Sequence, residues 1–191
     1  MPIPWWSKDT VNMEPDYSDP NSKSYRYCLE GCASGKGKAL NPLIIIALNP
    51  STADEKLPDD TMKRVVPYME INGFDGFVML NLYPLRSTNP KVLKGIVIDP
   101  EIRKKNLETI CQKVKEVTDK IKTAPTILLT FGTNIMINPK LRDCFKDIVE
   151  TCKTYNPKWT CLKKTKDGHP CHISRLPYGL PLLKFDVNAY I

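Results

Sequence analysis

Short apolar segments separated by polar stretches dominate the pattern of the chain from residue 43 onward. Residues 43–48 (LIIIAL), 77–83 (FVMLNLY) and 126–131 (TILLTF) are nearly continuous apolar runs. Such runs are typical of central parallel strands covered on both faces. A fourth strand is expected at residues 159–163, and YRYCL at residues 25–29 predicts a further short strand.

Helical patterns fill the intervals between these strands. Residues 99–122 begin with Asp99, an N-cap followed by proline, and then carry one apolar stripe. Residues 61–72 and 139–153 predict two more helices, the first of which Pro67 should kink or delay. Strands that alternate with helices predict an α/β fold, with helices on both faces of an open, mostly parallel, four-stranded sheet.

A chain of 191 residues is sufficient for one domain, which we place at residues 25–191. Residues 1–24 hold four prolines and two tryptophans and predict an irregular N-terminal arm. No stretch approaches the roughly 20 apolar residues of a membrane span, and no signal peptide is evident. Seven scattered cysteines then favour reduced thiols and a cytoplasmic location.

The formal charge of +7 suggests a polyanionic partner, and nucleic acid is the obvious candidate. A lysine-rich soluble surface explains the charge equally well. The glycine-rich motifs of dinucleotide enzymes and of P-loop NTPases are absent, and no cofactor is expected. The spacing of cysteines and histidines does not match structural zinc sites, so we expect no metal.

Polar residues follow each predicted strand, at the edge where open parallel sheets bind ligands. These residues should meet in one cleft; they are Asn49-Pro50-Ser51, Asn81, Gly132-Thr133-Asn134 and the loop at residues 165–174 (TKDGHPCHIS).

Asn49 could position a water or a substrate group, although an isolated Asn-Pro pair more often forms a turn. Asp54, just beyond, could supply a carboxylate. Asn81 interrupts a buried strand and must find partners, either the backbone or the edge of a nucleobase. His169 and His172, the only histidines, lie in one Gly/Pro-rich loop, which indicates a catalytic element or an incidental surface loop.

Several longer motifs resemble a known family. YRYCL, IALNPSTAD, NLYPLRSTNP, FGTN and TKDGHPCHISRLP resemble, in order, the signature segments of domain of unknown function family sixteen-forty-three. The resemblance covers residues 25–177, and the family name carries no settled activity.

A more distant resemblance is to the uracil-DNA glycosylase superfamily, a three-layer α/β/α fold with a four-stranded parallel sheet. Asn49-Pro50 is similar to its first motif, and Met79-Leu80-Asn81 to its base-reading strand. Phe131-Gly132 is similar to the step that ends its third strand. His172-Ile173-Ser174 follows its His-Pro-Ser loop in part, with isoleucine in place of proline.

The resemblance implies excision of a flipped base. Asn81 would bond the base edge, Tyr83 or, less readily, Tyr178 would stack on it, and Asn49 would orient the attacking water. His172 would donate a hydrogen bond to the base as negative charge develops. Three cations at the cleft mouth would hold phosphates, namely Arg86, Lys164 and Arg175.

These observations predict a glycosidase-like enzyme that cleaves the base–sugar bond of an unusual or modified base, in DNA rather than RNA or in a nucleotide. Asn49 replaces the carboxylate of the most active branches, which predicts weak activation of the water. A non-catalytic nucleic-acid-binding module and an enzyme of free modified nucleotides are the alternatives.

Overall fold

The computed structural model describes residues 11–17, 24–33, 39–51 and 61–191. One mixed sheet forms its centre, with strands in the order β1-β2-β4-β3-β5-β6-β7. The strands are β1 (Val11–Tyr17), β2 (Arg26–Ala33), β3 (Pro42–Ala47), β4 (Gly76–Asn81), β5 (Thr126–Leu129), β6 (Lys158–Cys161) and β7 (Leu183–Lys184). The α-helices of these described residues are α1 (Met62–Ile71), α2 (Pro100–Ile121) and α3 (Pro139–Cys152). The 3-10 helices are η1 (Pro90–Leu93), η2 (Thr133–Ile137), η3 (Lys153–Tyr155) and η4 (Ile173–Arg175).

The sheet is larger than the four strands expected from the apolar segments. The neighbours β4, β3, β5 and β6 run parallel to one another. Antiparallel pairs extend the sheet through β2 and β1 on one side and through β7 on the other. The expectation of an irregular arm at residues 1–24 is wrong for β1, which pairs along β2. Pro15 lies within β1, at an edge strand, where a missing backbone N–H is tolerated.

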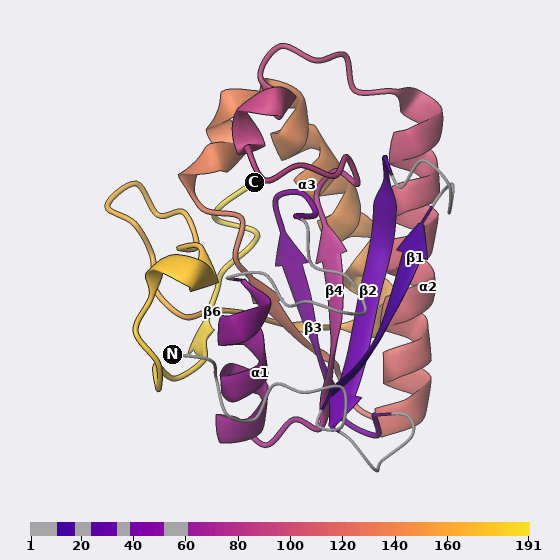
Figure 1. The fold of residues 1–191 in the computed structure, drawn as a ribbon, viewed down its shortest axis with the longest axis vertical. Helices are drawn as coiled ribbons and strands as arrows, with labels where there is room; N and C mark the ends of the chain where they lie inside the picture. Colours follow the sequence, from indigo (N-terminus) through magenta and orange to yellow (C-terminus); the bar gives the residue numbers. More distant parts are fainter. Residues whose placement is uncertain (1–10, 18–23, 34–38, 52–60) are drawn as a thin grey trace.

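The order of the parallel strands creates a switch point between β3 and β5. From β3 the chain passes through α1 to β4, then through α2 past β3 to β5, and through α3 to β6. Right-handed crossovers in opposite directions put their helices on opposite faces of a sheet. Accordingly α1 lies on one face, and α2 and α3 lie on the other (Figure 1).

Two hydrophobic cores result, one on each face of the sheet. The α1-side core packs strand residues against α1 and the loop around η4, and it includes Leu43, Ile45, Ala47, Met62, Val65, Met69, Phe77, Met79, Leu128, Ile173 and Leu176. The α2/α3-side core includes Ile44, Ile46, Val78, Leu80, Tyr83, Ile110, Val114, Ile127, Leu129, Phe131, Leu141 and Phe145. Alternate residues of each strand therefore enter different cores, which is why these strands are apolar throughout.

The predicted helix ends are confirmed at two places. The Asp99 side chain accepts hydrogen bonds from the backbone N–H groups of Glu101 and Ile102, at 2.9 and 3.1 Å. Gly73, at φ 75°, follows α1 and donates to the carbonyl of Glu70. Across the described residues, no helix combines the length and apolar character needed to cross a membrane.

Candidate active site

The carboxyl ends of the parallel strands lie level at one edge of the sheet. Ala47, the last residue of β3, pairs with Asn81, the last residue of β4. Ile46 of β3 pairs with Leu129 at the end of β5. Ligands bind beyond this edge, near the switch point, in sheets of this kind. The candidate site therefore lies beyond the ends of β3, β4 and β5.

The Asn49 side chain connects the end of β3 to the segment that follows β4 by hydrogen bonds. Its Nδ2 donates to the backbone carbonyls of Pro50, Leu85 and Ser87 at 3.2, 3.2 and 3.0 Å. These bonds use the amide nitrogen, whereas Oδ1 accepts no hydrogen bond from a described residue. The side chain thus has a structural role through its nitrogen and offers an acceptor through its oxygen.

Asn81 presents a buried amide without a partner. The residue is only 2% exposed, yet its side chain makes no hydrogen bond to the described part of the chain. Phe77 and Met79, which alternate with Asn81 along β4, belong to the α1-side core. The amide therefore faces the side of the sheet where α1 and the η4 loop lie. Neither amide atom is among the completely buried polar atoms that lack a partner, so the amide is placed to bond a water or a ligand.

Thr130 joins the end of β5 to the histidine loop. Its Oγ1 accepts a hydrogen bond from the Ile173 N–H at 2.6 Å and donates to the Cys171 carbonyl at 3.3 Å. Thr130 is fully buried, and its two hydrogen bonds are to the residues immediately before and after His172. Thr130 is not among the residues that the sequence predicted for the site, although a polar side chain inside TILLTF is a signal of the same kind as Asn81.

Gly132 brings the backbone of the β5 end against His172. A Cβ added at this glycine would lie 3.6 Å from the His172 Cβ, which is an ordinary van der Waals contact, so a side chain would fit here. The backbone conformation nevertheless requires glycine, because Gly132 has φ 67° and ψ −169°, which other residues rarely adopt. Its N–H also donates to the Pro170 carbonyl at 2.9 Å.

The local structure of η4 orients the His172 ring. The Ser174 backbone N–H donates to His172 Nδ1 at 3.3 Å, and Ser174 Oγ lies 2.8 Å from the same nitrogen. Since Nδ1 accepts a backbone hydrogen bond, the neutral ring carries its proton on Nε2. The half-buried His172 thus has a hydrogen-bond donor at the far end of its ring.

Helix α1 fixes the segment after η4. Arg64 donates through Nη1 to the Leu176 carbonyl at 3.1 Å, and the Tyr68 hydroxyl donates to the Pro177 carbonyl. The Arg64 guanidinium also lies 4.2 Å from the centroid of the Tyr178 ring. The histidine loop is therefore held from two directions, by Thr130 of the sheet and by α1.

The structure does not bring Tyr83 and His169 to this place. Tyr83 is 2% exposed in the α2/α3-side core and its hydroxyl accepts from the Asp99 N–H, so the ring is not available for stacking. Burial raises the pKa of this hydroxyl. His169 Nδ1 lies 2.6 Å from the Tyr190 hydroxyl, whose pKa burial raises to about 12. His169 therefore anchors the C-terminal segment.

The remaining candidates lie around the edge of the site or outside the described residues. Ser51 is half-buried, and its carbonyl accepts from Nε of the half-buried Arg86 at 3.2 Å. Asn134, Lys164 and Arg175 are exposed. Asp54 lies outside the described residues. Within the described ranges no group of three or more histidine, cysteine or acidic side chains could hold a metal ion.

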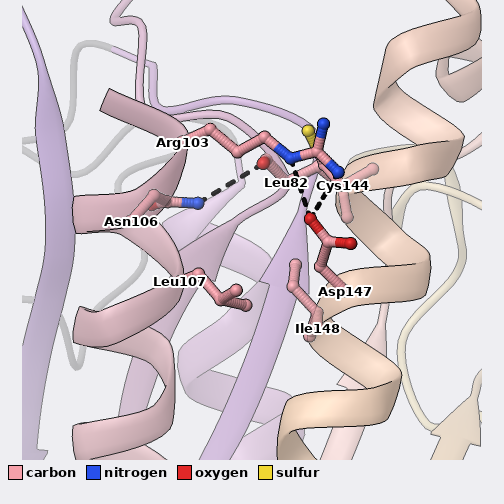
Figure 2. A pocket seen from close by; sticks show the side chains of 7 residues that line it. All are labelled: Leu82, Arg103, Asn106, Leu107, Cys144, Asp147 and Ile148. Carbon is pink, nitrogen blue, oxygen red and sulfur yellow. Dashed lines mark hydrogen bonds and ion pairs between the residues drawn. The ribbon is translucent and has the colours of Figure 1, made fainter. Parts of the chain in front are cut away.

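A small cavity lies on the other side of Asn81, between α2 and α3 (Figure 2). Asn106 lines it, and its Nδ2 donates to the backbone carbonyls of Asn81 and Leu82 at 2.9 and 3.3 Å. Arg103 and Asp147 form an ion pair across the same space. The cavity, at about 10 Å³, has room for roughly one water and is too small for a substrate. Asn106 is thus a support for the end of β4.

We expect Asn106→Leu to lower the free energy of unfolding by about 1–2 kcal/mol, because two buried carbonyls lose their donor. Urea unfolding with an unchanged m-value would measure this loss. The cost is limited because the substitution also removes Asn106 Oδ1, a buried acceptor without a partner. Wild-type stability would show that the two carbonyls find another donor.

The fold and the site together define an α/β protein with polar side chains at the carboxyl edge of its parallel strands. A family model described as "Protein of unknown function (DUF1643)" matches residues 26–172, most of the chain. The chain belongs to this family, as its signature segments indicate. No curated protein and no solved structure matches it significantly.

Proposed function

We propose that this protein is a glycosidase-like enzyme that cleaves the base–sugar bond of an unusual or modified base in DNA or in a nucleotide. The observation that carries the proposal is the amide of Asn81. It is 2% exposed and without a hydrogen bond to any described residue, at the sheet edge where ligands bind. A carboxamide offers one donor face and one acceptor face, which match the edge of a nucleobase.

The neighbouring groups supply the other functions that base excision needs. His172 presents Nε2–H, which can donate to a base oxygen as the glycosidic bond breaks and negative charge develops there. Asn49 Oδ1 can accept a hydrogen bond from the attacking water and orient it towards the cation-like sugar. An amide oxygen is a poor base, so this water is oriented more than activated, and slow turnover is expected.

The arrangement of the sheet and its helices also supports the proposal, although only at the level of the fold. Four parallel strands with helices on both faces agree with the three-layer arrangement that the resemblance to uracil-DNA glycosylases implies. Tyr83 cannot stack on the base in this conformation because its ring is in the α2/α3-side core. Exposed Tyr178, on the α1 side, is the remaining aromatic candidate among those the resemblance suggested.

The test is release of a base from a panel of substrates. DNA duplexes and single strands carrying uracil, hydroxymethyluracil, glucosylated cytosine or a mismatch are incubated with the protein and then with alkali, which breaks the strand at abasic sites. Free modified nucleotides are assayed in parallel by chromatography. Breakage or release with one member of the panel would support the proposal and identify the base.

We expect Asn81→Leu to abolish base release with little change in stability, because leucine has the same shape and no unpaired amide to bury. Leu82→Ala in the adjacent core is the control, and it should lower stability and retain activity. If the wild type were inactive on the whole panel but bound DNA in a salt-sensitive way, the proposal of an enzymatic activity would be wrong. The protein would then be a nucleic-acid-binding module. Activity in Asn81→Leu equal to that of the wild type would overturn the assigned role of the amide.

A further inference from the structure

The excess positive charge of the protein concentrates near its C-terminal end. Residues 163–184 contain five basic side chains and one acidic one, Asp167, in a chain whose net charge is +7. All five basic side chains are exposed; they are Lys163, Lys164, Lys166, Arg175 and Lys184, hereafter the basic strip.

Backbone pairing brings the basic strip together beside the histidine loop. The Lys163 carbonyl accepts from the Cys171 N–H at 2.8 Å, and Lys164 forms a β-bridge with Pro170. The Lys164 ammonium lies 5.0 Å from the centroid of the Phe185 ring, next to Lys184 of β7. The strip thus extends from β7, along the turn at residues 163–166, to Arg175 in η4.

The basic strip differs from the basic residues of α2, α3 and η3 in how many of its members form ion pairs. Of the ten basic residues on α2, α3 and η3, five pair with carboxylates, namely Arg103, Lys113, Lys115, Lys140 and Lys153. No member of the basic strip forms an ion pair with any residue in the described ranges. Unpaired, clustered cations attract a polyanion, whereas surface cations already paired do so weakly.

An exposed aromatic ring lies at the end of the strip nearest α1. Tyr178 is 48% exposed, although Arg64 stacks on its ring. Pro177 and Pro181 flank it, and α1 holds the preceding carbonyls, so the ring is presented on a restrained loop. An aromatic ring beside a row of cations is the combination that binds unstacked bases together with their phosphates.

We propose that the basic strip and Tyr178 bind single-stranded nucleic acid, the strip holding the phosphates and Tyr178 stacking on one unpaired base. A duplex keeps its base faces stacked and so offers Tyr178 nothing to stack on. The position of the strip agrees with this partner, since Lys166 and Arg175 lie on either side of His172 in sequence. The inference names the partner of that site and rests on the proposed function, but binding can be measured without any chemistry.

The experiment is fluorescence anisotropy of the full chain with labelled oligodeoxythymidylate and with a hairpin duplex of equal length. Unmodified thymidine is used, so the outcome does not depend on base release. One variant changes all five residues of the basic strip to glutamine. The matched control changes five exposed lysines on α2, α3 and η3 to glutamine and lowers the net charge equally; these are Lys104, Lys115, Lys140, Lys146 and Lys153.

We expect the strip variant to bind the single strand at least about tenfold more weakly, and its salt slope to fall by about 0.7 for each phosphate that the strip no longer neutralises. Tyr178→Ala should weaken binding about tenfold, and Tyr178→Phe should restore it. The control variant should bind nearly as the wild type does, and the duplex should bind more weakly than the single strand.

Three results would overturn the inference: equal weakening in the strip and control variants, no effect of Tyr178→Ala, or tighter binding of the duplex. Tighter binding to vesicles containing phosphatidylserine than to the oligonucleotide would assign the strip to membranes instead. If the strip binds single strands but no substrate releases a base, this inference would be supported and the proposed enzymatic activity would be wrong.

Discussion

His172→Ala is expected to lower the rate of base release by a factor of about 10²–10³, the usual loss when one donor to a developing negative charge is removed. The physical reason is the ring orientation, in which Ser174 occupies Nδ1 and leaves the proton on Nε2. Single-turnover formation of abasic sites, with the substrate that the panel identifies, measures the rate. The far-ultraviolet circular dichroism of the variant should match that of the wild type.

His169→Gln is the matched control because His169 is the only other histidine in the chain. Its ring lies against Tyr190, at 5.6 Å between centroids, and contributes to packing of the C-terminal segment. We expect lower thermal stability and an unchanged rate of base release. The assignment of His172 would fail if the two variants lost activity equally, or if His172→Ala had the wild-type rate.

Thr130→Val is expected to lower the free energy of unfolding by about 1–3 kcal/mol and to reduce activity as well. Valine keeps the shape of threonine but leaves the buried Ile173 N–H without an acceptor. Urea unfolding measures the first effect. The loss of activity is expected because Thr130 positions the loop that carries His172. The value of kcat should therefore fall more than KM changes, and the His172 ring resonances should shift in NMR spectra.

Thr160→Val separates the removal of a hydrogen bond from a change in loop position. Thr160 is also a buried strand threonine, and its hydroxyl donates to the Ile127 carbonyl at 3.0 Å within the sheet. This variant should lose stability and keep the His172 resonances and kcat of the wild type. Equal effects of the two substitutions on kcat would contradict a positioning role for Thr130.

The hydrophobic pattern predicted the strands and helices around the site well, because parallel strands buried on both faces leave an unmistakable apolar run. It missed β1, whose sequence VNMEPDY contains a proline and alternating charges and lacks an apolar run. An edge strand needs only one covered face and tolerates proline, so its sequence signal is weak. Pairing with β2, rather than composition, defines this strand.

The position of Asn81 at the end of β4 was predictable, because a polar residue that interrupts an apolar strand is easy to recognise in the sequence. The same argument applies to Thr130, but threonine is common in strands, so a threonine in a strand is not a distinctive signal of a site. Tyr83 was misplaced because β4 ends at Asn81, so the alternation that would put both side chains on one face stops there. Asn106 shares the buried stripe of α2 with Ile110 and Val114, where only the structure reveals the carbonyls it serves.

The bonds that hold the His172 loop join residues distant in sequence. Ile173 and Thr130 are 43 positions apart, Pro177 and Tyr68 are 109 apart, and Leu176 and Arg64 are 112 apart. Contacts of such separation form late in folding because closing long loops is entropically costly. A chain that has emerged only as far as β5 would have Asn81 in place but no histidine. The arrangement proposed for base excision therefore needs both the edge of the sheet and the histidine loop, so a chain that lacks residues 165–177 should show no base release.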